Sequence, residues 1–213
     1  GHVTCTDPEP AEPADLAPAG LILADVGAPR AEGAARAIER AAPEVSTRDD
    51  GTLPDLVILT GPVLPDLPAG LLRDRVPHLA LRAAEAIGVV GPLVRPGVSA
   101  CLVCVDRHKA DRDPQWPKVL AQATFGRAQP QACDTVLAAM TAAVAAGQAL
   151  AFIDRGGPAA GGSREPGTVN GTLELVLPGW RWRRRTWPPH SACGCGAFRA
   201  PAGTIPFAAC GTM

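Results

Sequence analysis

The chain has 213 residues, a length that suits one α/β domain with a small appendage and that allows a sizeable buried core. Apolar residues make up 46% of the chain and charged residues 19%, which excludes a disordered tail or a polar linker. The net charge of −1 gives no overall reason to expect nucleic acid or an anionic membrane as a partner.

The first fifty residues predict a strand, a loop and a helix. Residues 1–6 alternate in polarity and are rich in β-forming side chains, so we expect a strand that begins at the first residue. Residues 8–18 are rich in Pro and Glu and predict a loop. Residues 30–42 have a helix-forming composition between Pro29 and Pro43. The opening residues lack the basic and apolar segments of a secretory signal, so the expected location is cytoplasmic.

The middle of the chain predicts strands that alternate with helices. Residues 55–60 are a largely apolar run between Pro54 and Gly61, which is typical of a buried parallel strand. The elements expected next are a helix at 65–75, strands at 77–82 and 86–94, and a turn at 95–97. The order of strand, helix and strand predicts an α/β fold.

A long helix and a hairpin are predicted in the second half. Residues 132–154 form an alanine-rich segment whose weak hydrophobicity favours a packed helix over a membrane span. Partly helical structure is expected before it at 105–125, and a flexible Gly/Pro/Ser-rich loop after it at 156–167. Strands expected at 172–177 and 180–187 flank a Pro-Gly pair, which indicates a hairpin.

The cysteines point to a metal. The chain has seven, an odd number at uneven spacing, in a chain too long to need disulfide staples. Cys101 and Cys104 form a C-x-x-C pair, and Cys193 and Cys195 form a C-x-C pair. Two close thiolate pairs can complete a tetrahedron around zinc, and four thiolates leave no open position, so the predicted site is structural. A redox C-x-x-C and incidental cysteines are the alternatives.

The remaining cysteines and the histidines give weaker signals. Cys5 and Cys133 are expected to be ordinary buried thiols, and Cys210 lies in a Gly/Ala-rich tail where an acyl-acceptor role has no base to support it. His190, three residues before Cys193, is a rival zinc ligand, and the histidines show no mutual spacing typical of a metal triad. The acidic group that could suggest Mg²⁺, or simply a solvated helix start, is Asp106, His108, Asp111 and Asp113.

Charge is unevenly distributed along the chain. Residues 1–70 carry 12 acidic and 4 basic side chains, whereas residues 71–213 carry 9 acidic and 16 basic ones. The two parts are electrostatically complementary to each other, or one of them faces a charged partner, or the charges simply keep different surfaces solvated.

The run at 180–187 is the most unusual in the chain. On a strand, Trp180, Trp182 and Arg184 face one way, and the other arginines and Trp187 face the opposite way. Such a run could bind nucleic acid or an acidic peptide, but the preferred interpretation is one aromatic face on the core and one solvated basic face. No G-x-G-x-x-G, P-loop or G-x-S-x-G stands at a strand-to-helix turn, so no self-sufficient nucleotide site is expected.

The order of features resembles the ThiF/MoeB superfamily of ubiquitin-activating-like adenylating enzymes. It is most similar to the actinobacterial ThiF-like proteins that bind the leader peptide or partner the cyclodehydratase in azole-containing peptide (TOMM, bacteriocin) biosynthesis. The matching segments are DLVILT at 55–60, VPHLA at 76–80, GPLVRPG at 91–97, CLVC at 101–104, DRDPQWP at 111–117 and WPPHSACGC at 187–195. The resemblance implies a Rossmann-type, mostly parallel sheet that lacks its first strand, with a zinc-stapled C-terminal β-hairpin. It covers residues 1–197 as one partial domain and leaves 198–213 as an irregular tail.

The resemblance also bears on cofactors. In the superfamily a glycine-rich turn after the first strand binds ATP, and an acidic residue that ends the second strand binds the ribose. Residues 1–7 resemble that second strand, which implies Asp7 as a cofactor-binding residue and a glycine turn before residue 1. The catalytic aspartate expected after the 55–60 strand is replaced by Gly61-Pro62, with Asp66 farther along. These departures weigh against ATP and Mg²⁺, and no catalytic residue is assigned.

The expected function follows from this pattern. The chain resembles a C-terminal portion of such a protein, truncated before an N-terminal winged-helix-like module. It is expected to be a non-catalytic scaffold that presents a ribosomal precursor peptide to a YcaO-type ATP-dependent cyclodehydratase. The alternatives are an ATP-dependent adenylating enzyme that acts on a peptide or sulfur-carrier carboxylate, and a zinc-stapled nucleic-acid-binding module. A homodimer is implied by resemblance only, and no membrane or nucleic acid partner is expected.

Overall fold

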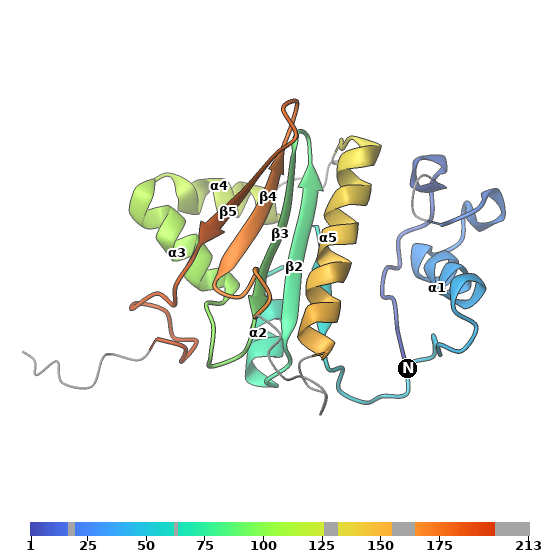
Figure 1. Ribbon diagram of the computed structural model, residues 1–213, viewed down its shortest axis with the longest axis horizontal. Coiled ribbons are helices and arrows are strands. Elements are labelled where there is room, and N and C mark those ends of the chain that lie inside the picture. Colours follow the sequence, from blue (N-terminus) through green and yellow to red (C-terminus); the bar gives the residue numbers. More distant parts are fainter. Residues whose placement is uncertain (17–19, 62–63, 126–131, 155–164, 199–213) are drawn as a thin grey trace, which may run out of the picture.

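A five-stranded sheet organises the part of the chain that the computed structural model describes, namely residues 1–16, 20–61, 64–125, 132–154 and 165–198. The sheet separates α5 from α3 and α4, and α1 lies beyond α5 in the same view (Figure 1). The helices are η1 (Pro13–Leu16), η2 (Leu23–Asp25), α1 (Arg30–Ala41), α2 (Asp66–Arg73), α3 (Leu102–Arg112), α4 (Trp116–Phe125) and α5 (Thr135–Ile153). The strands are β1 (Val57–Thr60), β2 (His78–Ala84), β3 (Ile87–Val94), β4 (Gly171–Val176) and β5 (Arg181–Thr186).

Most of the predicted elements are confirmed within a few residues. The helix expected at 30–42 is α1, and the helix expected at 65–75 is α2. The helix expected at 132–154 is α5, which Asp134 caps by accepting the N–H groups of Val136 and Leu137. The positions of proline and glycine predicted where these elements end, because either residue destabilises the interior of a helix or strand.

The prediction of a mostly parallel sheet is wrong. Only β1 and β2 pair in parallel, and the pairs β2–β3, β3–β4 and β4–β5 are antiparallel. The links from β2 to β3 and from β4 to β5 are short turns, and a parallel crossover needs a dozen residues or more. Short links therefore enforce the antiparallel pairing of β2 with β3 and of β4 with β5, and the predicted C-terminal hairpin of β4 and β5 is confirmed.

The strand expected at residues 1–6 is not formed. This segment makes one isolated parallel bridge, between His2 and Ser46, and the residues around it are exposed. A strand needs a hydrogen-bonded neighbour along its length, and the segment has only this point of pairing among the described residues. The expectation that 55–60 is a buried strand is also wrong in part, because β1 is an edge strand on which Leu59 alone is buried.

One face of the sheet packs against α5. The buried residues of this helix, Leu137, Thr141, Ala145 and Ala149, recur every four residues and so lie on one side. Ala145 joins a core cluster with Leu79, Val90, Leu93 and Val169. Among the described residues α5 is the one helix long and apolar enough to cross a membrane, with a mean hydropathy of 1.9. One side of this helix packs on β2 and β3, as predicted for a packed helix, while 22% of the apolar window as a whole is buried.

The opposite face of the sheet leads to the cysteines. Successive residues of a strand point to opposite faces, so Leu93 faces α5 while Val94 faces away from it. Val94 packs in a second buried cluster with Ala100, Cys101 and Cys104, against which Leu72, Cys193 and Cys195 are packed. This second core places both cysteine pairs at one end of β3.

Three sequence predictions fall wholly or partly outside the described residues. They concern Cys210, the tail at 198–213 apart from its first residue, and most of the loop at 156–167.

Candidate metal centre

Four cysteines that are far apart in the sequence come together beside α3. The Sγ atom of Cys101 lies 3.8 Å from that of Cys104 and 3.6 Å from that of Cys193. The Sγ atoms of Cys104 and Cys195 are also 3.6 Å apart, and all four lie within 4.8 Å of one another. This group, here called the thiol cluster, could hold a metal ion.

The size of the thiol cluster fits zinc. Zinc–thiolate bonds are about 2.3 Å long, so the sulfurs of a tetrahedral four-thiolate site lie about 3.8 Å apart. Three of the sulfur pairs measure 3.6 to 3.8 Å. Cys101 and Cys104 are buried, and the other two are partly exposed. Four protein ligands leave no position for a substrate, so the cluster suits a structural ion.

Helix α3 and the preceding loop position the first pair. Cys101 is the N-cap residue of α3 and Cys104 lies in its first turn, where the helix dipole favours thiolates. The loop before them is fixed by side chains, because the N–H of Arg95 donates to Ser99 Oγ at 2.7 Å. The N–H of Ala100 donates to Asn170 Oδ1 at 2.8 Å, which ties this loop to the residue before β4.

Burial and mutual repulsion affect the ionisation of these thiols. Burial raises the pKa of Cys101 far above its usual range, and the neighbouring thiols add to this. Burial also raises the pKa of Cys104, to about 11. For Cys195 burial opposes ionisation, but the N–H of Ala197 and the adjacent thiols outweigh it and lower the pKa. Four thiolates repel one another, and a bound divalent ion removes that repulsion.

The segment that carries the second pair is fastened to α3 at several points. The N–H of His190 donates to Cys104 Sγ at 3.4 Å. His108 Nε2 donates to the carbonyl oxygen of Pro188 at 2.9 Å, because a carbonyl can only accept. The guanidinium of Arg112 lies 5.0 Å from the ring of Trp187, which is buried. The thiol cluster therefore closes an already ordered contact between α3 and the segment after β5.

A second group of ligating side chains lies beside the thiol cluster. His108, Asp111 and His190 each offer one ligand atom, and these atoms lie within 4.8 Å of one another. The sequence showed no histidine triad because His190 is distant in the chain. The spacing of His108 and Asp111, one helical turn apart, was the available signal.

The group suggested for Mg²⁺ is assembled only in part, because His108 and Asp111 lie close together and the other two members do not join them. Asp106 accepts the indole N–H of Trp116 at 3.1 Å, and Asp113 accepts the N–H of Gln115 at 2.9 Å. Asp111 instead contacts His190. Asp106 and Asp113 therefore serve separate contacts.

Asp7, the residue predicted to bind the ribose, lies in the N-terminal part. Its carboxylate forms an ion pair with Arg30. Its Oδ2 accepts Arg30 Nε at 2.9 Å, and its Oδ1 accepts a second guanidinium N–H at 3.3 Å. The pair is about two-thirds buried on the arginine side. Asp66, the nearest acid after β1, begins α2 and is exposed.

The tryptophan and arginine run forms β5, the edge of the sheet. Its register places Arg181, Arg183 and Arg185 on one face and Trp182 and Arg184 on the other, as predicted. The expected burial of the aromatic face is wrong, because Trp180 and Trp182 are 44% and 45% exposed. The helix α5 packs on β2 and β3, and β4 separates those strands from β5.

One carboxylate neutralises part of the basic face. Glu174 on β4 is nearly buried and accepts hydrogen bonds from the guanidinium groups of both Arg183 and Arg185. Arg181 lies opposite Val176, and no ion pair to it is found within the described ranges. The face as a whole keeps an excess of positive charge.

The other residues considered from the sequence lie apart from the thiol cluster. Cys5 is exposed and Cys133 is partly exposed, so neither is the fully buried thiol that was expected. His78 is fully buried on β2, and its Nδ1 donates to the carbonyl of Val76 at 3.1 Å. Burial lowers the pKa of His78, so this imidazole stays neutral.

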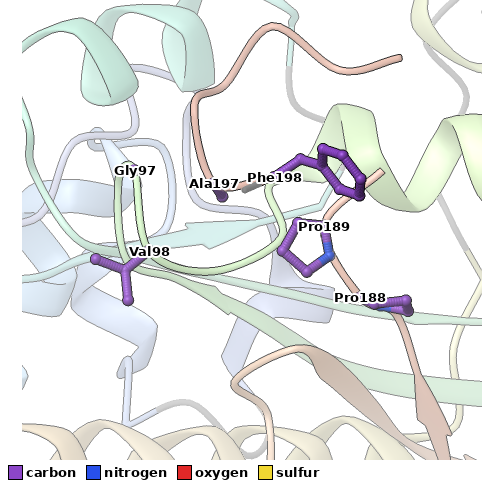
Figure 2. A pocket seen from close by; sticks show the side chains of 6 residues that line it. All are labelled: Gly97, Val98, Pro188, Pro189, Ala197 and Phe198. Carbon is purple, nitrogen blue, oxygen red and sulfur yellow. The ribbon is translucent and has the colours of Figure 1, made fainter. Parts of the chain in front are cut away.

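An apolar hollow of about 530 Å³ lies near the thiol cluster. Figure 2 shows the turn of Gly97 and Val98 on one side, with Pro188, Pro189 and Phe198 on the other. Ala197 completes the lining, which contains no titratable side chain. The hollow therefore offers a packing surface and no chemistry of its own.

Comparison with known proteins finds solved structures whose fold is similar to this one. No protein-family model matches the chain, and no curated protein matches it. Solved structures do match, among them Escherichia coli MccB with MccA-N7isoASN, at 17% identity and a TM-score of 0.70 over 93% of this chain and 60% of MccB. MccB is described as a microcin C7 biosynthetic enzyme.

Two further structures extend the comparison. MccB with ATP is 18% identical with a TM-score of 0.67, over 92% of this chain and 59% of MccB. PaaA is 17% identical with a TM-score of 0.59, over 84% of this chain and 62% of PaaA. The mixed α/β fold of this chain is similar to that of MccB. The chain spans about three-fifths of the length of these proteins.

Proposed function

We propose that the chain is a non-catalytic ThiF-like scaffold of ribosomal peptide modification, which presents a precursor peptide to a YcaO-type ATP-dependent cyclodehydratase. The observation that carries this proposal is the fold likeness to MccB, whose solved complexes include N-formylated MccA. The cyclodehydratase is proposed as the partner because the sequence resembles the ThiF-like partners of azole biosynthesis. Residues 1–197 would form one partial domain of this kind.

The proposed lack of catalysis depends on two positions. Asp7 is engaged by Arg30 at 2.9 Å, so a nucleotide ribose would have to displace a charged hydrogen bond to reach it. Gly61 follows β1 at the position where the superfamily has its catalytic aspartate, and glycine offers no group to hold a metal or a proton.

The proposed role of the zinc is structural. The ion would be held by Cys101, Cys104, Cys193 and Cys195, whose thiolates would fill its coordination shell. By fixing the segment after β5 to α3, it would hold the hairpin and its basic strand in place. The ion would supply folding free energy and no reactive position.

The proposed peptide contact is β5. This strand is the edge of the sheet, and a peptide can add to such an edge by main-chain hydrogen bonds. Its exposed tryptophans offer apolar contacts, and Arg181 and its neighbours favour an acidic segment.

The test is calorimetric titration of the precursor peptide encoded beside the gene into the zinc-loaded protein. Arg181→Glu together with Arg183→Glu should weaken peptide binding, with a larger loss at low salt than at high salt. Arg48→Glu together with Arg73→Glu is the matched control, because it reverses the same number of exposed charges away from β5. Circular dichroism checks that both variants fold. Equal affinity of variant and wild type at every ionic strength would contradict a role for β5.

A second candidate is an ATP-dependent adenylating enzyme that acts on a peptide or sulfur-carrier carboxylate. The observation that favours it is the fold likeness to MccB with ATP. Peptide-dependent pyrophosphate exchange that is lost in Asp7→Asn would support this candidate. The scaffold proposal predicts no heat of Mg-ATP binding and no exchange.

The proposal also includes a cytoplasmic location and a homodimer. Light scattering after gel filtration tests the oligomeric state. Retention on heparin beyond that expected for a net charge of −1 would favour the nucleic-acid alternative instead.

A further inference from the structure

The group of His108, Asp111 and His190 has the chemistry of a second metal site. His108 and Asp111 lie one turn apart on α3, and His190 reaches them from the segment after β5. The rings of His108 and His190 meet edge to face, with centroids 4.8 Å apart. Two imidazoles and one carboxylate are ligands that zinc, cobalt and nickel accept.

The ring of His108 is held in place by a hydrogen bond to the backbone. Its Nε2–H is donated to the carbonyl oxygen of Pro188 at 2.9 Å. A neutral imidazole carries one proton, so Nδ1 keeps its lone pair. Metal-binding histidines commonly donate their other ring N–H to such a carbonyl, which fixes the tautomer.

His190 and Asp111 form the other side of the group. His190 Nδ1 accepts the N–H of Ala192 at 3.1 Å, so the proton of the neutral ring is on Nε2. Nε2 donates this proton to Asp111 Oδ2 at 2.9 Å. A metal ion at Nε2 takes the place of this proton, which moves to Nδ1, and the exposed N–H of Ala192 then turns to water. The neutral ring exchanges tautomers and releases no net proton.

The group is rigid on one side and open on the other. The His190 side chain is 12% exposed, and its backbone N–H is tied to Cys104 Sγ. The Asp111 side chain is 64% exposed, so an ion and its water molecules can approach from that side. Rigid imidazoles beside an accessible carboxylate lower the cost of organising a site for an incoming ion.

We propose that His108, Asp111 and His190 bind a second divalent transition-metal ion, distinct from the ion of the thiol cluster. One ring nitrogen of His108, Asp111 Oδ2 and His190 Nε2 are its protein ligands, and water completes the coordination. With three protein ligands the site exchanges its ion more readily than the four-thiolate cluster does.

Cobalt provides the test because its spectrum distinguishes sulfur from nitrogen and oxygen ligands. Full-length protein loaded with one equivalent of zinc is titrated with Co²⁺, and bound metal is counted after gel filtration. We expect one equivalent of Co²⁺ to bind, with weak visible bands and no thiolate-to-cobalt charge transfer. Zinc at the thiol cluster should remain at one equivalent.

Two variants and a control assign the site. Asp111→Asn replaces an exposed carboxylate by an amide of the same shape, and His108→Ala removes a ring ligand; each should reduce Co²⁺ binding at least tenfold without loss of zinc. Asp113→Asn, at the end of the same helix, should bind Co²⁺ like the wild type. Wild-type protein that binds no second equivalent would overturn the proposal. Full Co²⁺ binding by Asp111→Asn and by folded His108→Ala would overturn it as well.

Discussion

The N-terminal region, residues 1–50, and the sheet region, residues 57–198, are held together by different forces. Within the described part of the N-terminal region only Ala11, Asp25 and Gly33 are buried, and its contacts are ion pairs such as that of Arg30 with Asp7. The sheet region buries large apolar side chains on both faces of the sheet and adds the thiol cluster. Apolar burial and metal ligation contribute more free energy than partly exposed ion pairs. The comparison predicts that perturbations of equal size have unequal effects in the two regions.

The largest expected effect is loss of the thiol cluster. Cys101→Ser should give a thermally fragile protein, since structural zinc sites contribute about 10 kcal/mol or more in small domains. Even half of that lowers the Tm of a chain of this size by roughly 10–20 °C. Calorimetry with and without a chelator measures the change.

Cys5→Ser is the matched control for this change. Cys5 is exposed in the N-terminal region, outside the thiol cluster. The Tm and the zinc content of the Cys5→Ser variant should therefore equal those of the wild type. A normal Tm for Cys101→Ser would count against the metal assignment.

The next effect compares apolar burial in the two regions. Leu79→Ala empties a fully buried position of the core cluster and should reduce the free energy of unfolding by about 2–5 kcal/mol. Leu23→Ala, at a side chain 77% exposed in the N-terminal region, should change it by no more than about 0.5 kcal/mol. Urea unfolding of both variants tests the difference. Equal losses would show that the N-terminal region contains a core of its own.

Two glycines, Gly88 on β3 and Gly147 in α5, test how tightly α5 packs against the sheet. A Cβ at Gly88 would collide with the hydroxyl of Thr141 and lie 3.2 Å from Leu137, so Gly88→Ala should destabilise by about 1–3 kcal/mol. Gly147 lies inside α5 with open space around its Cβ position. Gly147→Ala should therefore stabilise by about 0.5–1 kcal/mol. Thermal unfolding measures both, and a loss at Gly147 would mean that the outer side of α5 is covered.

The smallest effect is a local pH dependence in the N-terminal region. Hydrogen bonds from the Ile22 N–H and from Arg36 lower the pKa of the Asp25 carboxyl. A lowered pKa stabilises the folded form above the unfolded-state value of about 3.9, and the stabilisation is lost as the pH falls through the lower folded value.

Amide exchange in α1 measured from pH 6 down to pH 2 reports this loss. The protection factors of the α1 amides, which are corrected for the intrinsic pH dependence of exchange, should fall below about pH 4, and they should fall more than those of the β2 and β3 amides. Asp25→Asn should remove this pH dependence, because the amide does not titrate. If the α1 amides and the sheet amides lost protection at the same pH, the two regions would not differ in stability as we infer.

Local patterns predicted the elements well. Proline and glycine punctuation located α1, α2 and the β4–β5 hairpin, and apolar runs located β1 to β3. The spacing of the cysteine pairs predicted that Cys101 and Cys104 would meet Cys193 and Cys195, and the structure brings them together. Zinc itself stays a prediction. These features depend on neighbours in the sequence or on side chains with few alternative partners.

Long-range pairing was harder to predict. Residues 1–6 have the composition of a strand, but a strand forms only where another strand accepts its hydrogen bonds. The burial of Trp182 could not be judged from alternation, because alternation defines two faces and not which one is covered. His190 lies close to His108 and Asp111 because the chain after β5 runs back to α3, and no sequence pattern predicted that path.

The sequence by itself determined the helices, the strands, the hairpin and the four cysteines suited to one ion, because these follow from local propensity and from side-chain chemistry. Tertiary structure alone decided that the sheet is mostly antiparallel, that Asp7 is held by Arg30, and that two histidines and an aspartate meet beside the thiol cluster. The physical reason is that pairing and burial are free-energy differences between whole arrangements of the chain. No window of neighbouring residues contains the partners that compete for them.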